Sequence, residues 1–268
     1  MASPESAFAG SIPALYERHL GPLLFAPYAT ELARRLGDLT DGAVLETAAG
    51  TGIVTAALAS ALPAAVQIAA TDLNDAMIAV ASAKDGMERV RWSQADALAL
   101  PFDDAAFDAV VCSFGVMFYP DKSAGYAEAL RVLRPGGRHL VTIWDSLEHN
   151  DLTRIVDESM AREFPDDPPD FITTFPFGYA NPDLIRAQLE EAGFSAVGIE
   201  TVELPCRAES ASQAAIGICQ GTPLRMQIEA RGGDLESATA HATAAVQDAF
   251  GAGPIVARMQ ALLVTAVR

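Results

Sequence analysis

The sequence predicts an α/β fold in which helices cover both faces of a largely parallel sheet. Between Ala43 and Trp144, short apolar runs of β type alternate with segments of helical periodicity, which is the pattern of βαβ units. These runs are apolar along nearly their whole length, as expected of strands that are buried on both faces. A chain of 268 residues can bury one substantial core, so we expect a single domain, residues 1–268, that needs no disulfide or metal to fold.

Each element of this region has a local reason in the sequence. Strands are expected at residues 43–47, 66–71, 90–93, 109–113 and 138–144, and helices at residues 51–61, 74–84 and 122–133. Asn74 is a suitable N-cap for the second helix, because its side-chain oxygen can accept a hydrogen bond from an amide of the first turn. The third helix should end at Arg134-Pro135-Gly136-Gly137, since proline cannot continue a helix and glycine permits the reversal into the next strand.

The flanking segments are expected to add helices around this core. Residues 12–36 are predicted to form one or two helices broken near Gly21-Pro22 and Pro27, and residues 151–164 another helix. A proline-rich loop without regular structure is expected at 165–176, then a helix from Asn181-Pro182 to Gly193. The remaining expectations are a strand at 195–204, mostly helix at 208–250 and a strand at 261–267. The chain should therefore divide into a helical cap (1–40), a cofactor-binding core (41–147) and substrate-lid inserts (148–180 and 207–253).

Charge and composition exclude several classes of partner. The formal net charge of −17, with no basic cluster to offset it, argues against nucleic acid as a ligand. Residues 1–10 lack a basic segment followed by an apolar one, and no stretch approaches the roughly 18 apolar residues of a membrane span, so we expect a cytoplasmic protein. Cys112, Cys206 and Cys219 are widely spaced, which suggests a reducing compartment and no metal site. The oligomeric state is not encoded in any motif.

A glycine-rich turn marks the expected ligand site. Val44-Leu45-Glu46 is followed by Gly50-Thr51-Gly52, so a strand ends in a turn that opens a helix. Such a turn places free backbone amides and the positive end of a helix dipole at the carboxyl edge of the sheet. A purely structural turn would have the same sequence, so the turn alone does not define a ligand.

A second acidic residue favours an adenosine ligand. Asp72 ends the next strand, about twenty residues on, where a carboxylate can accept both hydroxyls of a ribose. The turn has Thr55 where a dinucleotide fingerprint has its third glycine, and it contains no basic residue to engage a pyrophosphate. S-adenosylmethionine is therefore favoured over NAD, although an NAD-dependent oxidoreductase remains a weaker alternative.

Five motifs in order resemble those of the class I methyltransferases, specifically small-molecule enzymes similar to the ubiquinone/menaquinone biosynthesis methyltransferases. They are Val44-Leu45-Glu46-Thr47-Ala48-Ala49-Gly50-Thr51-Gly52, Ala70-Thr71-Asp72-Leu73-Asn74-Asp75-Ala76-Met77, Gln94-Ala95-Asp96-Ala97, Pro101-Phe102-Asp103-Asp104-Ala105-Ala106-Phe107-Asp108-Ala109-Val110, and Ala129-Leu130-Arg131-Val132-Leu133-Arg134-Pro135-Gly136-Gly137. The resemblance covers nearly the whole chain and implies a Rossmann-like sheet of seven strands with helices on both faces. It also implies an antiparallel last strand, for which residues 261–267 are the candidate.

The resemblance implies roles for the first motif. The backbone from Ala48 through Gly50 to Gly52 would contact the methionine part of S-adenosylmethionine, and Glu46 would help to organise its ammonium end. Ala48 departs from the family, which often has a glycine at this position. Alanine is small enough to leave the site open.

The next motifs would hold the adenosine part of the cofactor. Asp72 would bind the ribose, Leu73 and Met77 would pack against adenine, and Asp96 with the Ala97 amide would read the edge of the base. Met77 could equally be ordinary helix core. The segment 113–119, beginning at Ser113, would border the methyl group, and Tyr16 of the cap is either a lid over the cofactor or simple helix packing.

The implied reaction is the in-line displacement of a sulfonium methyl group by an oxygen, nitrogen or carbon nucleophile of a small molecule. This chemistry needs chiefly alignment in a dry pocket, so few catalytic side chains are obligatory. His149 is the candidate for a general base or an acceptor contact, with a solvated loop histidine as the alternative. Aromatic residues of the 148–180 insert could line an acceptor pocket or merely anchor the loop: Phe164, Phe171, Phe175, Phe177 and Tyr179. A cofactor-binding protein without transferase activity is the second alternative function.

Overall fold

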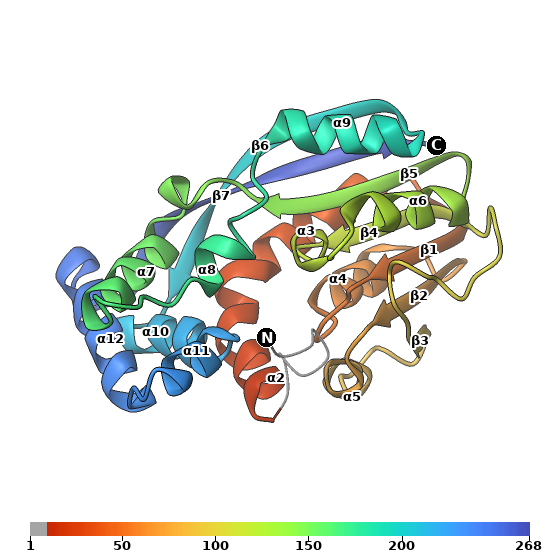
Figure 1. Cartoon of the computed structure of the whole chain (residues 1–268). Coiled ribbons are helices and arrows are strands. Elements are labelled where there is room, and N and C mark those ends of the chain that lie inside the picture. The colour runs from red at the N-terminus through yellow and green to blue at the C-terminus, as the bar shows by residue number, and fades with distance from the viewer. Residues whose placement is uncertain (1–9) are drawn as a thin grey trace.

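The computed structural model describes residues 10–268; the start of the expected cap and N-terminal segment, residues 1–9, lies outside the described residues. Within residues 10–268, seven strands form one sheet in the order β3-β2-β1-β4-β5-β7-β6 (Figure 1). Neighbouring strands pair in parallel except at β7, which runs antiparallel to both β5 and β6. The expected seven-stranded sheet with an antiparallel last strand is thus confirmed. The strands are β1 Gly42–Thr47, β2 Val66–Asp72, β3 Val90–Gln94, β4 Phe107–Ser113, β5 Leu133–Trp144, β6 Ser195–Ala208 and β7 Ile255–Val267.

Helices surround the sheet, and several begin at the residues that the sequence indicated. The Asn74 side chain accepts a hydrogen bond from the Ala76 amide, and Asn181 caps its helix in the same way. Gly193 ends that helix in the left-handed conformation, with φ of 105°. The helices are α2 Ile12–Leu15, η1 Tyr16–Phe25, α3 Ala26–Arg35, α4 Ile53–Ala61, α5 Asp75–Ser82, η2 Val116–Phe118, α6 Lys122–Val132, η3 Leu147–His149, α7 Asp151–Glu163, α8 Phe171–Thr174, α9 Pro182–Ala192, α10 Ala211–Gln220, α11 Leu224–Ala230 and α12 Leu235–Phe250.

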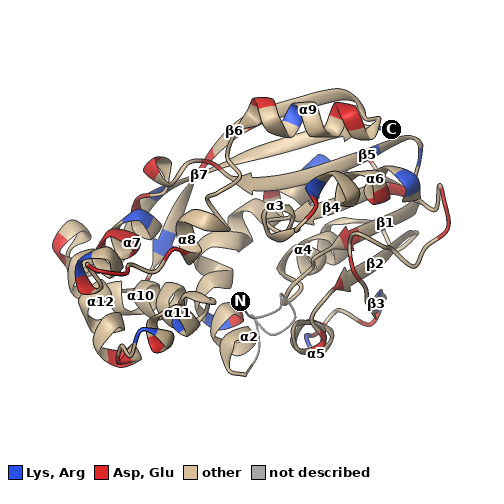
Figure 2. Ribbon diagram, in the orientation of Figure 1, with Lys and Arg blue, Asp and Glu red and all other residues tan. Residues whose placement is uncertain are grey.

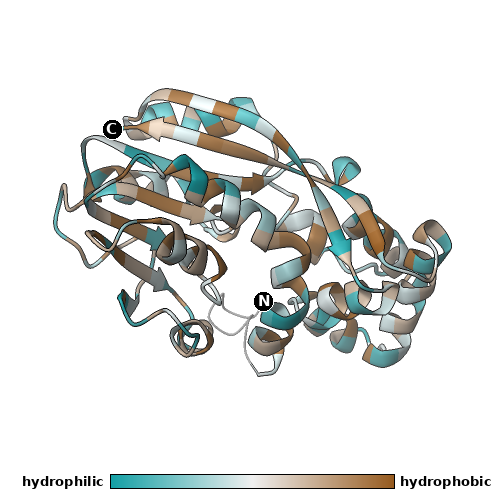
Figure 3. Ribbon diagram, turned by 180° about the vertical axis from the view of Figure 1, so that it is seen from behind, coloured by the Kyte–Doolittle hydropathy of each residue, from teal (hydrophilic) through white to brown (hydrophobic). Residues whose placement is uncertain are grey.

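The core lies on both faces of the sheet because successive side chains of a strand point to opposite faces. Val44 of β1 packs in a cluster with residues of α3 and α4, whereas its neighbour Leu45 packs in a second cluster with residues of α6 and α9. Both side chains are fully buried. Seen from behind, the inner strands are among the most apolar parts of the ribbon (Figure 3). This explains why their sequences are apolar along nearly their whole length.

Two local expectations were wrong. Residues 12–35 form continuous helical structure, because a π-helical stretch, η1, carries the chain past Gly21 and Pro22 without a break. Pro27 lies in the first turn of α3, directly after η1, so the helical structure also passes this proline without a break. The loop at 165–176 contains the short helix α8, which packs Phe171 and Ile172 into the core. Apolar burial thus overrides the local signals of proline and glycine.

The last two strands are longer than expected and extend beyond the rest of the sheet. β5 pairs with β7 only as far as Trp144 opposite Ala261, whereas β6 continues to pair with β7 down to Ile255. The helices α10, α11 and α12 connect the far ends of β6 and β7, and α7 packs on α12. The helical inserts therefore form a lobe beside the carboxyl edge of the sheet (Figure 1).

The surface carries the acidic excess of the sequence. In Figure 2 the Asp and Glu positions are distributed over the outer helices and loops of the ribbon, with Lys and Arg positions interspersed among them. No helix within residues 10–268 is both long enough and apolar enough to span a bilayer.

Candidate cofactor-binding site

The glycine turn between β1 and α4 has an unusual backbone. Ala48, Gly50 and Gly52 all adopt left-handed conformations, with φ of 51°, 56° and 75°. Gly52 is required here, because a Cβ atom at this position would lie 2.9 Å from both the Cβ of Ala81 and the ring of Trp92. Ala48 is the exception, since a residue with a Cβ normally avoids this region. Its Cβ lies so close to Gly115 that only glycine fits opposite it.

The turn leaves polar capacity unused by the protein. The side chain of Thr51 is 1% exposed, yet its hydroxyl has no hydrogen-bond partner among the described residues. A Cβ at Gly50 would meet no atom within 4 Å, so the backbone there faces open space. An unpaired buried hydroxyl next to an accessible backbone at the start of a helix is what a polar ligand would complete. The residues of the turn therefore fit the methionine end of S-adenosylmethionine.

Asp72 lies beside this turn at the end of β2. Its two carboxylate oxygens accept hydrogen bonds from the amides of Gly50 and Asn74, each at 2.8 Å. Burial raises the pKa of Asp72, and the backbone amides act in the opposite direction. The structure thus joins the two features that the sequence placed 22 residues apart, and the second oxygen lone pairs of the carboxylate remain available to ribose hydroxyls.

The Glu46 side chain is buried next to the glycine turn and does not face solvent. Its side chain is 1% exposed, and the Thr55 hydroxyl donates a hydrogen bond of 2.5 Å to its Oε2. Burial raises the pKa of Glu46 to about 8; the Thr55 hydrogen bond lowers it and the Asp72 charge raises it. At neutral pH the carboxyl is therefore mostly protonated, and it supports the turn from below.

The remaining adenosine-side candidates surround the same edge. Met77 is 4% exposed on α5, and Leu73 is half-buried just before that helix. Asp96 is exposed, and one of its carboxylate oxygens accepts from the Leu98 amide at 2.9 Å. The Ala95 amide donates to the Asp72 carbonyl at 3.0 Å, which holds the segment that carries Asp96 and Ala97 next to the end of β2.

The cap reaches this edge through Tyr16. Burial raises the pKa of the Tyr16 phenol above its ordinary value, and the charge of Asp72 adds to the effect. The Tyr16 ring stacks on Phe25 with centroids 4.9 Å apart. A salt bridge of 2.6 Å between Glu17 and Lys84 of the core fastens the same turn of η1. Sequence reasoning missed Glu17 and Lys84, because the ion pair joins segments 67 residues apart without a local motif.

A group of aromatic rings flanks the site at the ends of β4 and β5. Phe114 stacks on Trp144 with ring centroids 4.0 Å apart, and Phe25 and Tyr28 of the cap pack against both rings. Phe114 has φ of 52°, which is rare for a bulky residue and occurs mainly where surrounding structure enforces it. Phe177 of the 148–180 insert stacks on Trp144 at 5.9 Å.

These rings were only partly foreseen. The insert contributes Phe177, and Phe171 and Phe175 stack with Phe118 of η2. Phe164 instead packs beside Gly233, and the hydroxyl of Tyr179 hydrogen-bonds to Tyr126 and Gln188, so these two belong to other contacts. Phe114 belongs to the predicted segment 113–119, whereas Phe25, Tyr28 and Trp144 were not among the candidates, because their meeting depends on how the cap crosses the sheet. The hydroxyl of Ser113, at the end of β4, forms a hydrogen bond of 2.8 Å with the Thr142 hydroxyl.

His149 lies farther along the sheet edge than the cofactor candidates. Its Nδ1 is 3.5 Å from a carboxylate oxygen of Asp145 and 3.3 Å from the Ser146 hydroxyl. The neighbouring Glu148 carbonyl accepts from Arg258 of β7, which lies on the side of β5 away from β1. The structure therefore groups His149 with the β5–β7 end of the sheet, two strands from the glycine turn.

Comparison with known proteins agrees with this geometry. Residues 44–137 match the family model described as a methyltransferase domain. A ubiquinone/menaquinone biosynthesis C-methyltransferase of Shewanella halifaxensis is 30% identical over 167 residues, 58% of this chain and 66% of that protein. A demethylmenaquinone methyltransferase of Clavibacter sepedonicus is 39% identical over 109 residues, 40% of this chain and 43% of that protein. The matched part of the chain thus covers 66% of the length of the first relative and 43% of the length of the second.

The fold is also similar to that of solved methyltransferase structures. A phosphoethanolamine N-methyltransferase 2 of Haemonchus contortus, whose structure contains S-adenosylhomocysteine, superimposes with a TM-score of 0.60 at 17% identity, over 96% of this chain and 56% of that one. At this identity the likeness concerns the fold alone. Together with the matched family model, the turn and Asp72, it leads to one conclusion: the chain carries a methyltransferase domain of the class I, S-adenosylmethionine-dependent kind.

Proposed function

We propose that this protein transfers the methyl group of S-adenosylmethionine to a small-molecule acceptor. The observation that carries the proposal is the turn at residues 48–52, with its unpaired Thr51 hydroxyl, held beside the Asp72 carboxylate by the Gly50 amide. The cofactor supplies an electrophilic methyl group when it is bound. The protein's part is then to bind, to align and to exclude water.

We propose that one group of residues at the carboxyl edge of the sheet binds the cofactor and another group binds the acceptor. We propose that the turn and Asp72 hold the methionine and ribose parts, with Leu73, Met77, Asp96 and the Ala97 amide around adenine. Tyr16 would close the site from the cap, residues 1–40, over the core, residues 41–147. The Glu17–Lys84 ion pair, one residue along η1, holds this part of the cap against the core and supports the lid role.

The acceptor would lie on the aromatic side of the same edge. Phe114 and Trp144 are 6% and 4% exposed, whereas Phe25 and Phe177 are partly exposed and could contact a bound molecule. The inserts, residues 148–180 and 207–253, would complete this side as a lid. Carbon is the favoured acceptor atom because the relatives include a ubiquinone/menaquinone biosynthesis C-methyltransferase. An activated carbon nucleophile needs little beyond orientation, and the proton that this carbon loses can pass to water, so the proposal does not depend on His149 as a general base.

The expected setting is cytoplasmic. Cys112, Cys206 and Cys219 are all buried free thiols, which suits a reducing compartment. The acidic surface supports a small-molecule acceptor over nucleic acid.

Calorimetry on the full chain tests the cofactor assignment. We expect one equivalent of S-adenosylmethionine or S-adenosylhomocysteine to bind. Asp72→Asn should weaken that binding at least about tenfold, or about 1.4 kcal/mol, because a neutral amide is a poorer acceptor for ribose hydroxyls. Asp85→Asn, at an exposed site after α5, is the matched control and should bind normally. No binding to the parent protein would contradict the proposal.

Transfer itself needs a separate measurement. Cofactor with a labelled methyl group should label a member of a panel of quinols, phenols, amines and activated carbon acids. Normal cofactor binding without transfer to any acceptor would favour a cofactor-binding protein that is not a transferase.

A further inference from the structure

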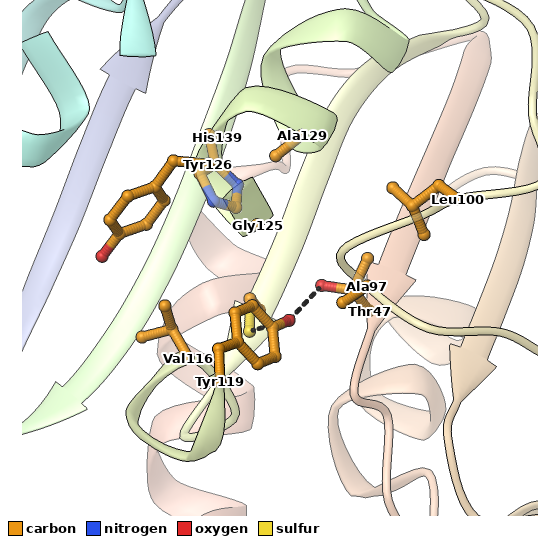
Figure 4. Close-up of a pocket in the computed structure, with 10 residues that line it drawn as sticks. Thr47, Ala97, Leu100, Val116, Tyr119, Gly125, Tyr126, Ala129 and His139 are labelled. Carbon is orange, nitrogen blue, oxygen red and sulfur yellow. Dashed lines mark hydrogen bonds between the residues drawn. The ribbon is translucent and has the colours of Figure 1, made fainter. Parts of the chain in front are cut away.

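A small cavity lies between the sheet and α6, next to segment 113–119 (Figure 4). Its volume is about 10 Å³, and its walls come from β1, β4, β5 and α6. This is about the space that one water molecule requires, and a cavity of this size holds water only if polar groups line it. The identity of those groups therefore decides whether the cavity is dry.

One wall carries a chain of three polar side chains. The Tyr119 hydroxyl donates to the Thr47 hydroxyl at 3.3 Å and contacts the Cys112 sulfur at 3.3 Å. The oxygen-to-oxygen bond is long for hydroxyl groups, which leaves both with capacity for a further partner. Gly125 makes room for this arrangement, because a Cβ there would lie 2.6 Å from the Tyr119 ring.

The opposite wall carries a histidine nitrogen that needs a donor. The Nδ1 of His139 lies 3.0 Å from the Val110 carbonyl oxygen, which can only accept, so Nδ1 holds the ring proton. Burial lowers the pKa of His139 to about 4, and the ring is neutral. Its Nε2 is then an acceptor, and no group within residues 10–268 donates to it.

Two aromatic rings pack against the His139 imidazole, and neither supplies a hydrogen-bond donor to Nε2. Phe194 stacks on one face of the imidazole at 5.6 Å, and Tyr126 packs edge-on at 6.1 Å. The Tyr126 hydroxyl points away from the cavity and hydrogen-bonds to Tyr179 at 3.3 Å (Figure 4). A small molecule in the cavity is thus the remaining source of a hydrogen-bond donor for Nε2.

We propose that this cavity binds one structural water molecule, which donates a hydrogen bond to His139 Nε2 and has the Tyr119 hydroxyl group as its second polar neighbour. Thr47 directly precedes the glycine turn, and Tyr119 ends the segment 113–119. The water would therefore lie next to residues that adjoin both the glycine turn and segment 113–119. The proposal does not rest on the proposed function, and its test needs no cofactor.

A crystal structure of the full chain, at a resolution that shows ordered water, tests the proposal. We expect one density peak in the cavity within hydrogen-bond distance of His139 Nε2. In His139→Phe, which keeps a ring but removes the acceptor, the peak should be lost. In Tyr126→Phe, which removes a hydroxyl that faces away from the cavity, the peak should remain. An empty cavity in the parent protein would overturn the proposal.

A second measurement keeps the test decisive if His139→Phe fails to fold. In the parent protein with ¹⁵N-labelled histidine, the Nε2 resonance of His139 should be that of an unprotonated nitrogen shifted upfield by an accepted hydrogen bond. The resonance of a free, unprotonated nitrogen, or of a protonated Nε2, would refute the assignment.

Discussion

Thr51 illustrates at the scale of a residue how an unsatisfied group can indicate a ligand. Its hydroxyl is buried in the glycine turn without a partner among the described residues. Thr51→Val keeps the shape but removes the hydroxyl. We expect cofactor affinity to fall about fivefold, since one hydrogen bond contributes about 1 kcal/mol, while the unliganded protein becomes no less stable. Calorimetry and urea unfolding measure the two effects.

The matched control for this experiment is Thr51→Ser, which keeps the hydroxyl and should keep most of the affinity. If valine and serine bind the cofactor equally well, the Thr51 hydroxyl is not a cofactor ligand. A loss of stability in the valine variant would instead assign the hydroxyl a structural partner.

Glu46 predicts a pH dependence of stability. Its pKa rises from 4.5 to about 8 on folding, so the fold favours the protonated form. The contribution of this group is fully present below about pH 4.5 and is lost as the pH rises through 8. Glu46→Gln cannot titrate. It should therefore gain stability relative to the parent between about pH 6 and about pH 9, as measured by urea unfolding at both values.

The direction of this difference is the test. Asp72 has a raised pKa as well and contributes to the pH dependence of both proteins. Because its charge also raises the pKa of Glu46, the difference between variant and parent includes the coupling of the two carboxyls. A variant-to-parent difference that stays constant with pH would show that Glu46 is ionised in the fold.

At the scale of an element, the turn between β1 and α4 stores strain at Ala48. This residue has φ of 51° although it carries a Cβ atom. Ala48→Gly should raise the free energy of unfolding by up to about 1 kcal/mol, because left-handed backbone is unfavourable for alanine by roughly that amount. Ala48→Val, with a branched side chain in the same backbone, should be clearly destabilised. Thermal unfolding of both variants checks the order; equal stability would exclude strain.

The π-helical stretch η1 of the cap is held against the core mainly by burial, and Glu17 adds an ion pair to Lys84. The Glu17–Lys84 pair is partly exposed, with side chains 33% and 23% accessible, so it should contribute no more than about 1 kcal/mol. Lys84→Met should leave the melting temperature nearly unchanged but speed hydrogen exchange in η1 several-fold. Lys122→Met, on α6, is the control and should not affect η1. Unchanged hydrogen exchange in η1 would mean that burial alone holds η1 against the core.

For the whole molecule, ligand binding should appear as thermal stabilisation. A ligand that binds only the folded state at a hundred times its dissociation constant adds about 2.7 kcal/mol, which corresponds to roughly 5 to 10 °C in a protein of this size. We expect S-adenosylhomocysteine to give such a shift and NAD to give none. The opposite pattern in a thermal-shift assay would favour the oxidoreductase alternative.

Much of the fold followed from local patterns. The apolar runs of β1, β2, β3 and β4 were placed within one or two residues, and the caps at Asn74, Asn181 and Gly193 were correct. These signals act within a few residues of the chain. The expected break at Gly21-Pro22 was wrong because Leu20 and Leu23 are buried, and this burial keeps the cap helical through the proline.

The glycine turn, Asp72 and their proximity were determined by the sequence alone, because parallel neighbouring strands end at one edge and a glycine turn must follow β1. The tertiary structure decided which side chains face that edge. It buried Glu46 and stacked the Tyr16 ring on Phe25. It also joined Phe25, Phe114 and Trp144 from three distant segments. Burial and ring packing depend on neighbours that are far away in the chain, and no local pattern contains them.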